Sequence, residues 1–401
     1  MRNFKIAVLT ATRAEYGLLR SVMFRIAADE MLELQILVTG MHLSEEFGYT
    51  YQEIEEDGFH IDVRVPILGK GNSAFDTSCA MARALEGFGR YFENSASRPD
   101  LLIVLGDRYE TLAVVLAAAN ARIPIAHIHG GETTEGAIDE AIRHAITKFS
   151  YLHFASTDMH ARRIVQLGEQ PERVFSVGAL GVENINNVQL LSKAELEKSI
   201  GFSLDKPYAV VTYHPVTLEK ESVKEQFSQL LRALDQFDMK YVITKSNADE
   251  GGTIINRMID EYAFERTNVL TVTSLGMRRY LSALRYCTMA IGNSSSGIVE
   301  APSFHVPTVN IGDRQRGRLA PKSVICCRTE TGSIIEAIKK ALSNKFLNSI
   351  RDMNSPYEKI GTSEIIVKTI KDFLVRGRIE LKKQFYDLEG DLCISKMEGK
   401  I

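Results

Sequence analysis

Short runs of apolar residues recur along the chain, and each is followed by a turn and by a segment with the spacing of an amphipathic helix. These runs cover residues 5–10, 34–39, 101–106, 124–128 and 174–178 in the first half, and 209–212, 241–244, 269–273, 289–292, 308–311 and 323–327 in the second. Continuous apolar strands that alternate with helices are typical of parallel sheets covered on both faces. The pattern therefore predicts an α/β protein with two doubly wound, Rossmann-like domains.

A break in this series marks the boundary between the two domains. Residues 184–187 are polar, residues 190–200 have the pattern of a linking helix, and Asp205-Lys206-Pro207 precedes a new strand. We predict a first domain over residues 1–185, a second over 186–360, and a C-terminal segment over 361–401. The apolar spacing from residue 363 to about residue 385 predicts a helix that packs back on the first domain.

The predicted topology also indicates where a ligand would bind. The carboxyl ends of parallel strands meet at one edge of a sheet, and ligands of such sheets bind outside that edge. Two domains that face each other would then share a cleft between their strand ends. The polar residues that directly follow each strand are therefore the candidates for chemistry.

Composition excludes several classes of protein. The 401 residues are 45% hydrophobic and 25% charged, and the net charge of −3 leaves no basic surplus for nucleic acid. The five cysteines are odd in number and scattered without metal-ligand spacing, which indicates a reducing compartment. The longest apolar stretch, residues 112–119, falls far short of the roughly 20 residues that span a bilayer. Without a secretory signal either, we expect a cytoplasmic protein.

In the first half, the candidate residues begin with two arginines at strand ends. Arg13 stands where a helix starts, and a guanidinium at a helix N-terminus binds phosphate well. The alternative is a solvated Arg13 with Glu15 capping the helix. Asp107 and Arg108 follow the strand at 101–106, where a carboxylate and a guanidinium would face the cleft. The alternative for Asp107 is an N-cap of the next helix.

The next strand ends in a histidine-rich segment, His127-Ile128-His129-Gly130-Gly131-Glu132. Strand alternation would point His127 and His129 to the same side, and the two glycines would let the backbone approach a ligand. Two histidines at this spacing could bind a metal only with a third ligand that the sequence does not identify, so we expect no metal. Further on, Asp139 and Arg143 fall near the start of another helix.

In the second half, the strongest signal is a serine-rich turn between a strand and a helix. Ser294, Ser295, Ser296 and Gly297 would form a nest of N–H and O–H donors that fits a diphosphate, and Glu300 could accept from ribose hydroxyls. The nearby strand ends add three further candidates: His214, Arg314 and Asn247. The chain contains no G-x-G-x-x-G and no P-loop, which disfavours dinucleotides and phosphoryl transfer. Carboxylates opposite a diphosphate site favour a sugar nucleotide as the ligand.

As a set, these motifs resemble those of the hydrolysing UDP-N-acetylglucosamine 2-epimerases of bacterial sialic acid biosynthesis. The resemblance rests on residues 12–17 (TRAEYG), 38–42 (VTGMH), 106–108 (GDR), 127–132 (HIHGGE), 142–144 (IRH), 214–215 (HP), 292–297 (GNSSSG) and 312–315 (GDRQ), and it covers roughly residues 4–375. It implies a two-domain fold of the glycosyltransferase-B type. It also implies the reaction of UDP-N-acetylglucosamine with water to N-acetylmannosamine and UDP, by elimination to 2-acetamidoglucal and rehydration.

The resemblance also implies roles for individual residues. Asp107, Glu132 and Asp139 would be the acid/base groups; His214 and Arg13 would contact the diphosphate, with Arg108, Ser294 and Ser295 alongside; Glu300 would hold the ribose, and Asn247 would lie near the uracil. His129, His42, Arg143, Ser296, Gly297 and Arg314 fall in or beside the same motifs and complete the expected site. Neither a cofactor nor a metal is implied, and a homo-oligomer, dimer or tetramer, is expected.

One departure from the family pattern leaves a role open. Several relatives carry a catalytic glutamate where this chain has His129, so that role would pass to His129 itself or to Glu132. The alternatives in function are a non-hydrolysing 2-epimerase, a related nonulosonic-acid pathway epimerase with another nucleotide sugar, a glycosyltransferase of the same fold, and a nucleotide-sugar binding module without catalysis.

Overall fold

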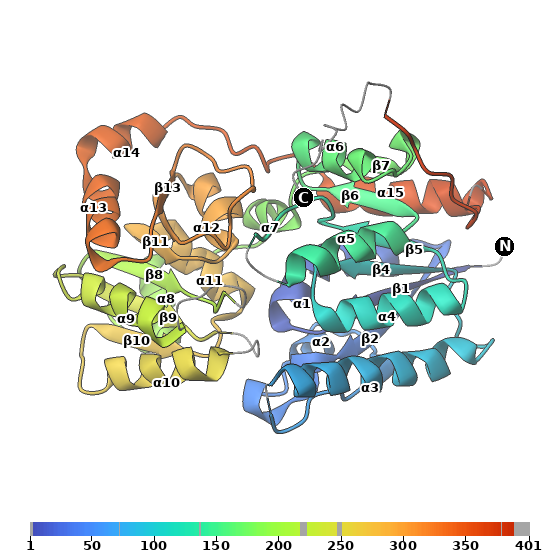
Figure 1. Cartoon of the computed structure of the whole chain (residues 1–401), viewed down its shortest axis with the longest axis horizontal. Helices are drawn as coiled ribbons and strands as arrows, with labels where there is room; N and C mark the ends of the chain where they lie inside the picture. Colours follow the sequence, from blue (N-terminus) through green and yellow to red (C-terminus); the bar gives the residue numbers. More distant parts are fainter. Residues whose placement is uncertain are drawn as a thin grey trace, which may run out of the picture.

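The computed structural model describes residues 3–71, 73–135, 138–216, 223–246, 251–377 and 379–388. Its strands form two separate sheets, and every strand pair in both sheets is parallel. The sheets define two lobes that lie side by side, each with helices packed on its sheet (Figure 1). The predicted α/β fold with two doubly wound, Rossmann-like halves is confirmed.

The first lobe is built on seven described strands in the order β3-β2-β1-β4-β5-β6-β7. These strands are β1 (Phe4–Thr10), β2 (Leu32–Thr39), β3 (Val63–Val65), β4 (Leu101–Leu105), β5 (Ile125–Ile128), β6 (Leu152–Ala155) and β7 (Val174–Ser176). The helices of this part of the chain are α1 (Arg13–Ala27), α2 (Gln52–Glu56), α3 (Ala74–Glu93), α4 (Tyr109–Asn120), α5 (Asp139–Phe149), α6 (Asp158–Gln166) and α7 (Leu180–Asn187).

The second lobe has six described strands in the order β10-β9-β8-β11-β12-β13. These strands are β8 (Tyr208–Thr212), β9 (Lys240–Thr244), β10 (Val269–Val272), β11 (Met289–Gly292), β12 (Thr308–Ile311) and β13 (Val324–Cys327). The helices are α8 (Lys193–Ile200), α9 (Val223–Leu234), α10 (Gly252–Ala263), α11 (Gly276–Tyr286), α12 (Ser296–Val299), α13 (Thr331–Leu342) and α14 (Asn344–Ile350).

Burial on both faces explains why the strands read as continuous apolar runs. In β1, Ile6 and Val8 belong to a cluster that includes side chains of α1, whereas Ala7 and Leu9 belong to a second cluster with side chains of α3 and α4. Successive side chains of a strand point to opposite faces, so both sets must be apolar when helices cover both faces. The strand ends are then left as the places where polar groups gather.

Two strands of the first lobe escaped the sequence pattern. β3 has only three residues, Val63-Arg64-Val65, and lies at the edge of the sheet. β6 is fully buried but carries His153, which interrupts an otherwise apolar run and pairs with the buried Glu169 at 3.1 Å. The hydrogen-bond partner of this buried histidine lies 16 residues further along the chain, so the local spacing of apolar residues does not reveal the strand.

The chain returns to the first lobe after completing the second. Helix α15 (Thr362–Val375) contacts α1 and α7, and Ile366, Val367 and Ile370 belong to the core of the first lobe. In Figure 1 this helix, in red, lies among the blue and green elements of that lobe. The helix predicted up to about residue 385 is too long, because α15 ends before Gly377, whose φ of 60° is left-handed.

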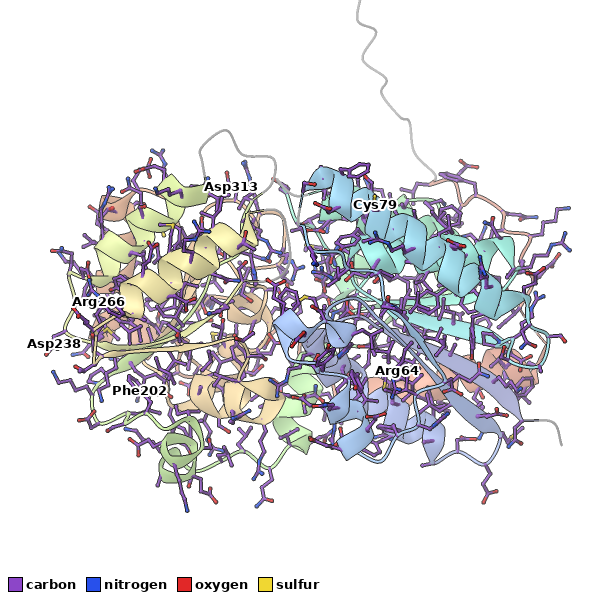
Figure 2. All side chains as sticks on the ribbon, turned by 90° about the horizontal axis from the view of Figure 1, so that it is seen from below. Arg64, Cys79, Phe202, Asp238, Arg266 and Asp313 are labelled. Carbon is purple, nitrogen blue, oxygen red and sulfur yellow. The ribbon has the colours of Figure 1, made fainter. Side chains whose placement is uncertain are left out.

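Seen from below, side chains of both lobes extend into the region between them (Figure 2). Arg64 and Cys79 mark the first lobe in this view, and Asp238 and Arg266 mark the second. Within the described ranges, no helix combines the length and the apolar character needed to cross a membrane.

Candidate active site

A cavity of about 330 Å³ lies between the two lobes at the carboxyl ends of their strands. Gly17, Gly181 and Asn184 line it from the first lobe, and Thr212, Lys245 and Tyr280 from the second. Seven of the residues predicted from the sequence also line it: Arg13, His214, Ser294, Ser295, Ser296, Glu300 and Arg314. The structure therefore brings together most of the residues expected around a diphosphate and its ribose.

The serine turn is held in place by contacts behind it. Gly292 has a φ of 133°, and a Cβ atom there would lie 1.9 Å from the Thr212 carbonyl oxygen, so only glycine fits. The Asn293 side chain accepts from the His214 backbone N–H at 2.7 Å and donates to the His214 carbonyl at 2.7 Å. Tyr280 donates its hydroxyl to Ser296 Oγ at 2.9 Å. These contacts fix the serine hydroxyls and the His214 loop relative to each other.

Glu300 directly follows α12 and is enclosed by protein, and burial raises its pKa to about 6. It touches the first lobe, because a Cβ atom on Gly181 would lie 2.1 Å from Glu300 Oε1. The carboxyl group thus sits in the cavity wall where the two lobes meet. A carboxyl group in that position is a natural acceptor for ligand hydroxyls.

Arg13 begins α1, as predicted, and the expected capping of that helix by Glu15 is present, but Arg13 is not a solvated side chain. Thr12 and Glu15 form a capping box at the start of the helix. Arg13 itself reaches across the cleft: its guanidinium pairs with Glu53 of its own lobe and contacts the Ser274 carbonyl of the other lobe at 3.5 Å. Because Thr12 and Glu15 cap the helix, the Arg13 side chain is not needed as a cap. It lines the cavity, where it supplies positive charge.

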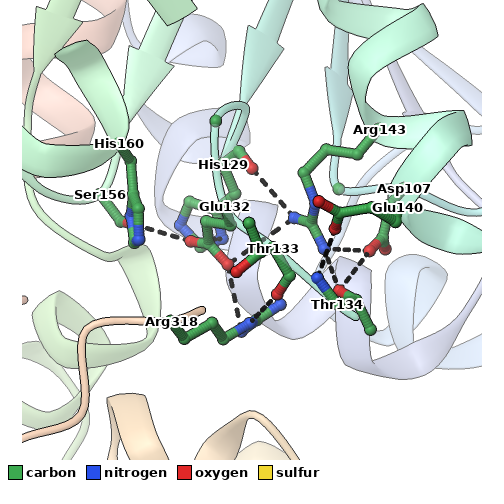
Figure 3. A network of polar contacts seen from close by, with 12 residues as sticks. Asp107, His129, Glu132, Thr133, Thr134, Glu140, Arg143, Ser156, His160 and Arg318 are labelled. Carbon is green, nitrogen blue, oxygen red and sulfur yellow. Dashed lines mark hydrogen bonds and ion pairs between the residues drawn. The ribbon is translucent and has the colours of Figure 1, made fainter. Parts of the chain in front are cut away.

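A second group of polar residues, which we call the acid cluster, consists of Asp107, His129, Glu132 and Arg143 (Figure 3). The Arg143 guanidinium is buried at its centre. It donates to Asp107 and to the His129 carbonyl at 3.1 Å, and it lies 3.7 Å from Glu132 Oε2. One guanidinium therefore holds two carboxylates that follow two neighbouring strands, β4 and β5.

Asp107 does not cap the next helix, which is the alternative interpretation of this residue. Helix α4 begins at Tyr109, its N-cap residue is Arg108, and no side chain caps it. Asp107 instead pairs with Arg143 and accepts from Thr134 Oγ1 at 3.4 Å. It follows Gly106, whose φ of 79° turns the chain away from the strand.

Glu132 is buried and surrounded by donors. Ser156 donates its hydroxyl to Oε1 at 2.7 Å, Arg318 of the second lobe lies 3.1 Å from Oε2, and His129 lies 4.0 Å away. Burial alone would raise the pKa of Glu132, but the guanidinium groups of Arg318 and Arg143 outweigh burial and hold that pKa well below its usual range. Glu132 is therefore an anion at neutral pH.

The two histidines of β5 have different surroundings. His127 Nε2 lies 2.8 Å from the Gly106 carbonyl oxygen and Nδ1 lies 3.2 Å from Thr147 Oγ1, and burial lowers the pKa of His127 to about 3. A neutral His127 that donates to Gly106 fixes the loop that carries Asp107. His129 lies beyond the strand with a φ of 63°, so the alternation used to place both side chains on one side stops at Ile128.

The predicted residues Arg108, His42 and Gly297 lie outside both the cavity and the acid cluster. Arg108 pairs with the buried Glu110 at 2.6 Å, and His42 lies 2.9 Å from Thr10 and 2.8 Å from Thr50, with its pKa lowered by burial to about 4. Gly297 packs behind the serines, where its carbonyl accepts from Thr308 Oγ1 at 2.6 Å.

Asp139 is partly exposed at the first position of α5, and Asn247 lies outside the described residues. Among the residues that the structure describes, no group of three or more His, Cys, Asp or Glu has the arrangement of a metal site.

Sequence reasoning missed two residues that the structure brings to the site. Arg318 enters the acid cluster from the second lobe, and Tyr280 holds Ser296 from α11. Arg318 did stand in the charged run at 313–318, but a charged run is usually solvated, and its spacing does not show which arginine is buried. Tyr280 carried no signal in the sequence.

Comparison with known proteins identifies the family. Residues 25–371 match the family described as UDP-N-acetylglucosamine 2-epimerase. The chain is 40% identical to the GDP/UDP-N,N'-diacetylbacillosamine 2-epimerase (hydrolyzing) of Campylobacter jejuni, over 97% of this chain and 100% of that protein. It is also 40% identical to the polysialic acid biosynthesis protein P7 of Escherichia coli, over 96% of this chain and 97% of that protein.

A third relative and two solved structures extend the comparison. The UDP-N,N'-diacetylbacillosamine 2-epimerase (hydrolyzing) of Legionella pneumophila is 36% identical over 84% of this chain and 89% of that protein. The UDP-GlcNAc 2-epimerase of Neisseria meningitidis bound to UDP-GlcNAc has a TM-score of 0.77 at 19% identity, over 92% of this chain and 100% of that chain. The S. aureus MnaA–UDP structure also has a TM-score of 0.77, at 18% identity over 96% of this chain and 100% of that chain.

The solved structures show that the fold is shared with these 2-epimerases and is of the glycosyltransferase-B type. With the family match over most of its length and relatives at 40% identity, the chain belongs to the UDP-N-acetylglucosamine 2-epimerase family and is an enzyme of the UDP-sugar 2-epimerase type.

Proposed function

We propose that this enzyme is a hydrolysing 2-epimerase that converts UDP-N-acetylglucosamine and water to N-acetylmannosamine and UDP. The observation that carries the proposal is the presence of two unlike sites at one cleft: a cavity lined by arginine, histidine and serines, and two carboxylates paired with the guanidinium of Arg143. Arg318 interacts with Glu132 of the second site and with Glu300 in the wall of the cavity. The first suits a nucleoside diphosphate, and the second suits proton transfer on the group that the diphosphate carries.

The cavity would hold the UDP part. Arg13, His214 and Arg314 would face the diphosphate together with the hydroxyls of Ser294, Ser295 and Ser296, because all of these residues line the same cavity. Glu300 would accept from the ribose hydroxyls. UDP leaves with additional negative charge as its bond to the sugar breaks, and cationic side chains placed at the diphosphate stabilise that charge.

The reaction proceeds through elimination and rehydration. The C2–H bond of the sugar is not acidic, so the bond between C1 and the UDP oxygen must be largely broken while a base removes the C2 proton. The electron pair of the C–H bond forms the C1–C2 double bond of 2-acetamidoglucal, and UDP takes the electron pair of the C1–O bond. Water then adds to C1 while a proton returns to C2 from the opposite face, which gives N-acetylmannosamine.

The acid cluster would carry the two proton transfers. Glu132 is an anion in the structure and is therefore present in its basic form, and Asp107 pairs with the same guanidinium. Burial lowers the pKa of His129, which leaves its ring neutral next to Glu132. A neutral imidazole both accepts and donates, so His129 would support the role that a glutamate has in other relatives. Asp139, at the start of α5, is the third proposed acid/base group.

The names of two relatives favour a second candidate substrate, UDP-N,N'-diacetylbacillosamine, which has the same 2-acetamido group and the same leaving group. The polysialic acid relative, at 40% identity, supports the sialic acid pathway and hence UDP-N-acetylglucosamine. Both substrates require the same chemistry at C1 and C2. A comparison of kcat/KM for the two sugars decides between them.

The decisive experiment is incubation with UDP-N-acetylglucosamine in heavy water with no acceptor sugar, followed by proton and phosphorus NMR. The proposal predicts free UDP and N-acetylmannosamine with deuterium at C2. Intact UDP-N-acetylmannosamine would instead identify a non-hydrolysing epimerase. No reaction with UDP-N-acetylglucosamine or with UDP-N,N'-diacetylbacillosamine would identify a transferase or a binding module.

A further inference from the structure

One turn of the second lobe connects the cavity with the acid cluster. We call residues 313–318, between β12 and β13, the bridging turn. It approaches the serine turn of its own lobe with one end and the Glu132–Glu135 segment of the first lobe with the other. The inference drawn from it rests on the proposed function.

The first half of the bridging turn is anchored to the cavity. Gln315 donates from Nε2 to the Asn293 carbonyl at 2.8 Å, and Arg314 donates to the same oxygen at 3.2 Å. Asn293 is the residue whose side chain brackets the His214 backbone. The position of the turn therefore depends on the same residue that fixes the serine and histidine loops around the proposed diphosphate.

The second half of the bridging turn touches the first lobe. Thr133 donates its hydroxyl to the Arg316 carbonyl at 3.1 Å, and Arg318 donates from Nε to the Thr133 carbonyl at 3.0 Å. Gly317 has a φ of 82°, and a Cβ atom there would lie 2.5 Å from Thr133 Oγ1, so glycine allows the close approach. Tyr357 anchors the far end by donating to the Leu319 carbonyl at 3.0 Å.

The bridging turn makes two ion pairs across the cleft, and they differ in burial. Arg316 and Glu135 are 3.4 Å apart with side chains 67% and 49% exposed, so water screens that pair. Arg318 and Glu132 are 3.1 Å apart with side chains only 8% and 3% exposed. The Glu132 carboxylate also faces His129, Arg143 of α5, His160 of α6 and, at longer range, Tyr357. Of these groups, Arg318 alone comes from β12–β13.

We propose that Arg318 is a positioning residue that completes the acid cluster from the opposite lobe and holds Glu132 there as an oriented carboxylate. The link runs from Asn293 through Gln315 to Arg318 and Thr133.

The test compares Arg318→Gln and Arg318→Lys with Arg316→Gln, which removes the exposed pair of the same turn. For Arg318→Gln we expect kcat to fall by about 100-fold, while KM and the dissociation constant of UDP stay within about threefold. The acidic limb of the kcat–pH profile should move to higher pH, because Glu132 loses its strongest cationic partner and binds a proton more readily.

Arg318→Lys retains the charge but loses the Nε contact with Thr133, so kcat should lie between wild type and Arg318→Gln. Arg316→Gln should change kcat by less than about threefold. If Arg318→Gln does not fold, as judged by its melting temperature, Arg318→Lys and Thr133→Val carry the test, with about a tenfold loss of kcat expected in each at unchanged UDP affinity.

Three outcomes overturn the inference. The first is an Arg318→Gln enzyme with kcat within about threefold of wild type and an unmoved acidic limb. The second is a loss of UDP affinity as large as the loss of kcat, which would make Arg318 a nucleotide ligand. The third, a wild-type enzyme that turns over no UDP-sugar, overturns the proposed function as well. Wild-type activity with an insensitive Arg318 overturns the inference alone.

Discussion

The two lobes meet at one cleft but organise their polar groups in opposite ways. In the first lobe, Glu132 and Arg143 are buried, Asp107 is partly buried, and the Arg143 guanidinium pairs with both carboxylates. In the second lobe, the serine turn and Arg314 line an open cavity and are held from behind by Asn293. Buried, mutually balanced charges are suited to chemistry on a small reacting centre, and accessible donors are suited to a large anionic ligand. On the proposed function, the first lobe would therefore serve turnover and the second lobe binding.

Asp107→Asn should give the largest change, and it should affect turnover alone. Loss of one proposed acid/base group is expected to lower kcat by about 10³-fold, whereas the dissociation constant of UDP should stay within about threefold, because Asp107 does not line the cavity. UDP release and titration calorimetry measure the two quantities. Asp238→Asn, at an 87% exposed position of the second lobe, is the matched control. More than a tenth of wild-type kcat in Asp107→Asn would contradict its role.

Arg13→Gln should give the opposite pattern, because Arg13 lines the cavity. We expect UDP to bind about 10- to 100-fold more weakly, since a charge-assisted contact with the diphosphate is lost. The loss should shrink as salt is raised, because screening weakens the wild-type contact. Calorimetry at two salt concentrations provides the measurement. An unchanged UDP affinity would place Arg13 outside the binding half of the cleft.

Gly181→Ala tests the contribution of Glu300 to UDP binding, and its expected effect on UDP affinity is smaller than that of Arg13→Gln. The added methyl group would meet Glu300 Oε1 at 2.1 Å and push that side chain away from the cavity wall, so UDP affinity should fall about tenfold. Gly181 lies within α7, where alanine is otherwise favourable. Gly89→Ala in α3, where an added Cβ meets nothing within 4 Å, is the control. Equal UDP affinities in the two variants would remove Glu300 from the binding site.

The last prediction concerns stability, not activity, and it falls on the first lobe. Burial lowers the pKa of His42 to about 4, of His127 to about 3 and of His160 to about 4. The unfolded chain binds these protons below pH 6.5 and the folded chain does not, so stability falls as the pH drops from 6.5 towards 4. Each histidine contributes up to about 1.4 kcal/mol per pH unit. Unfolding monitored at pH 7 and 5 checks this, and His42→Gln should reduce the slope.

The sequence was sufficient for features that depend on neighbouring residues. The strand at residues 101–105 is apolar throughout and is found as β4, and Thr12 and Glu15 mark the start of α1 that places Arg13. The serine turn, which the sequence marks by a strand, a glycine and three hydroxyls in succession, lines the cavity. Each of these signals lies within a few residues of the structure that it predicts.

Features that depend on distant residues could not be predicted in this way. The sequence allows Arg108 either to line the cavity or to pair with Glu110. In the structure it pairs with the buried carboxylate of Glu110. Arg318 stands 186 residues after Glu132 in the chain, and only the packing of the two lobes shows that it is the buried arginine of its run. His129 has a left-handed backbone conformation and therefore does not continue the strand, and the sequence does not predict this conformation.

The measurement that tests the central claim most directly uses UDP-N-acetylglucosamine labelled with ¹⁸O at the oxygen between C1 and the β-phosphorus. After turnover in heavy water, phosphorus NMR locates the label and proton NMR reports the hydrogen at C2. The proposed elimination predicts that all of the ¹⁸O stays with UDP and that N-acetylmannosamine carries one deuterium at C2. Label in the released sugar, or a C2 that retains its original hydrogen, would contradict it.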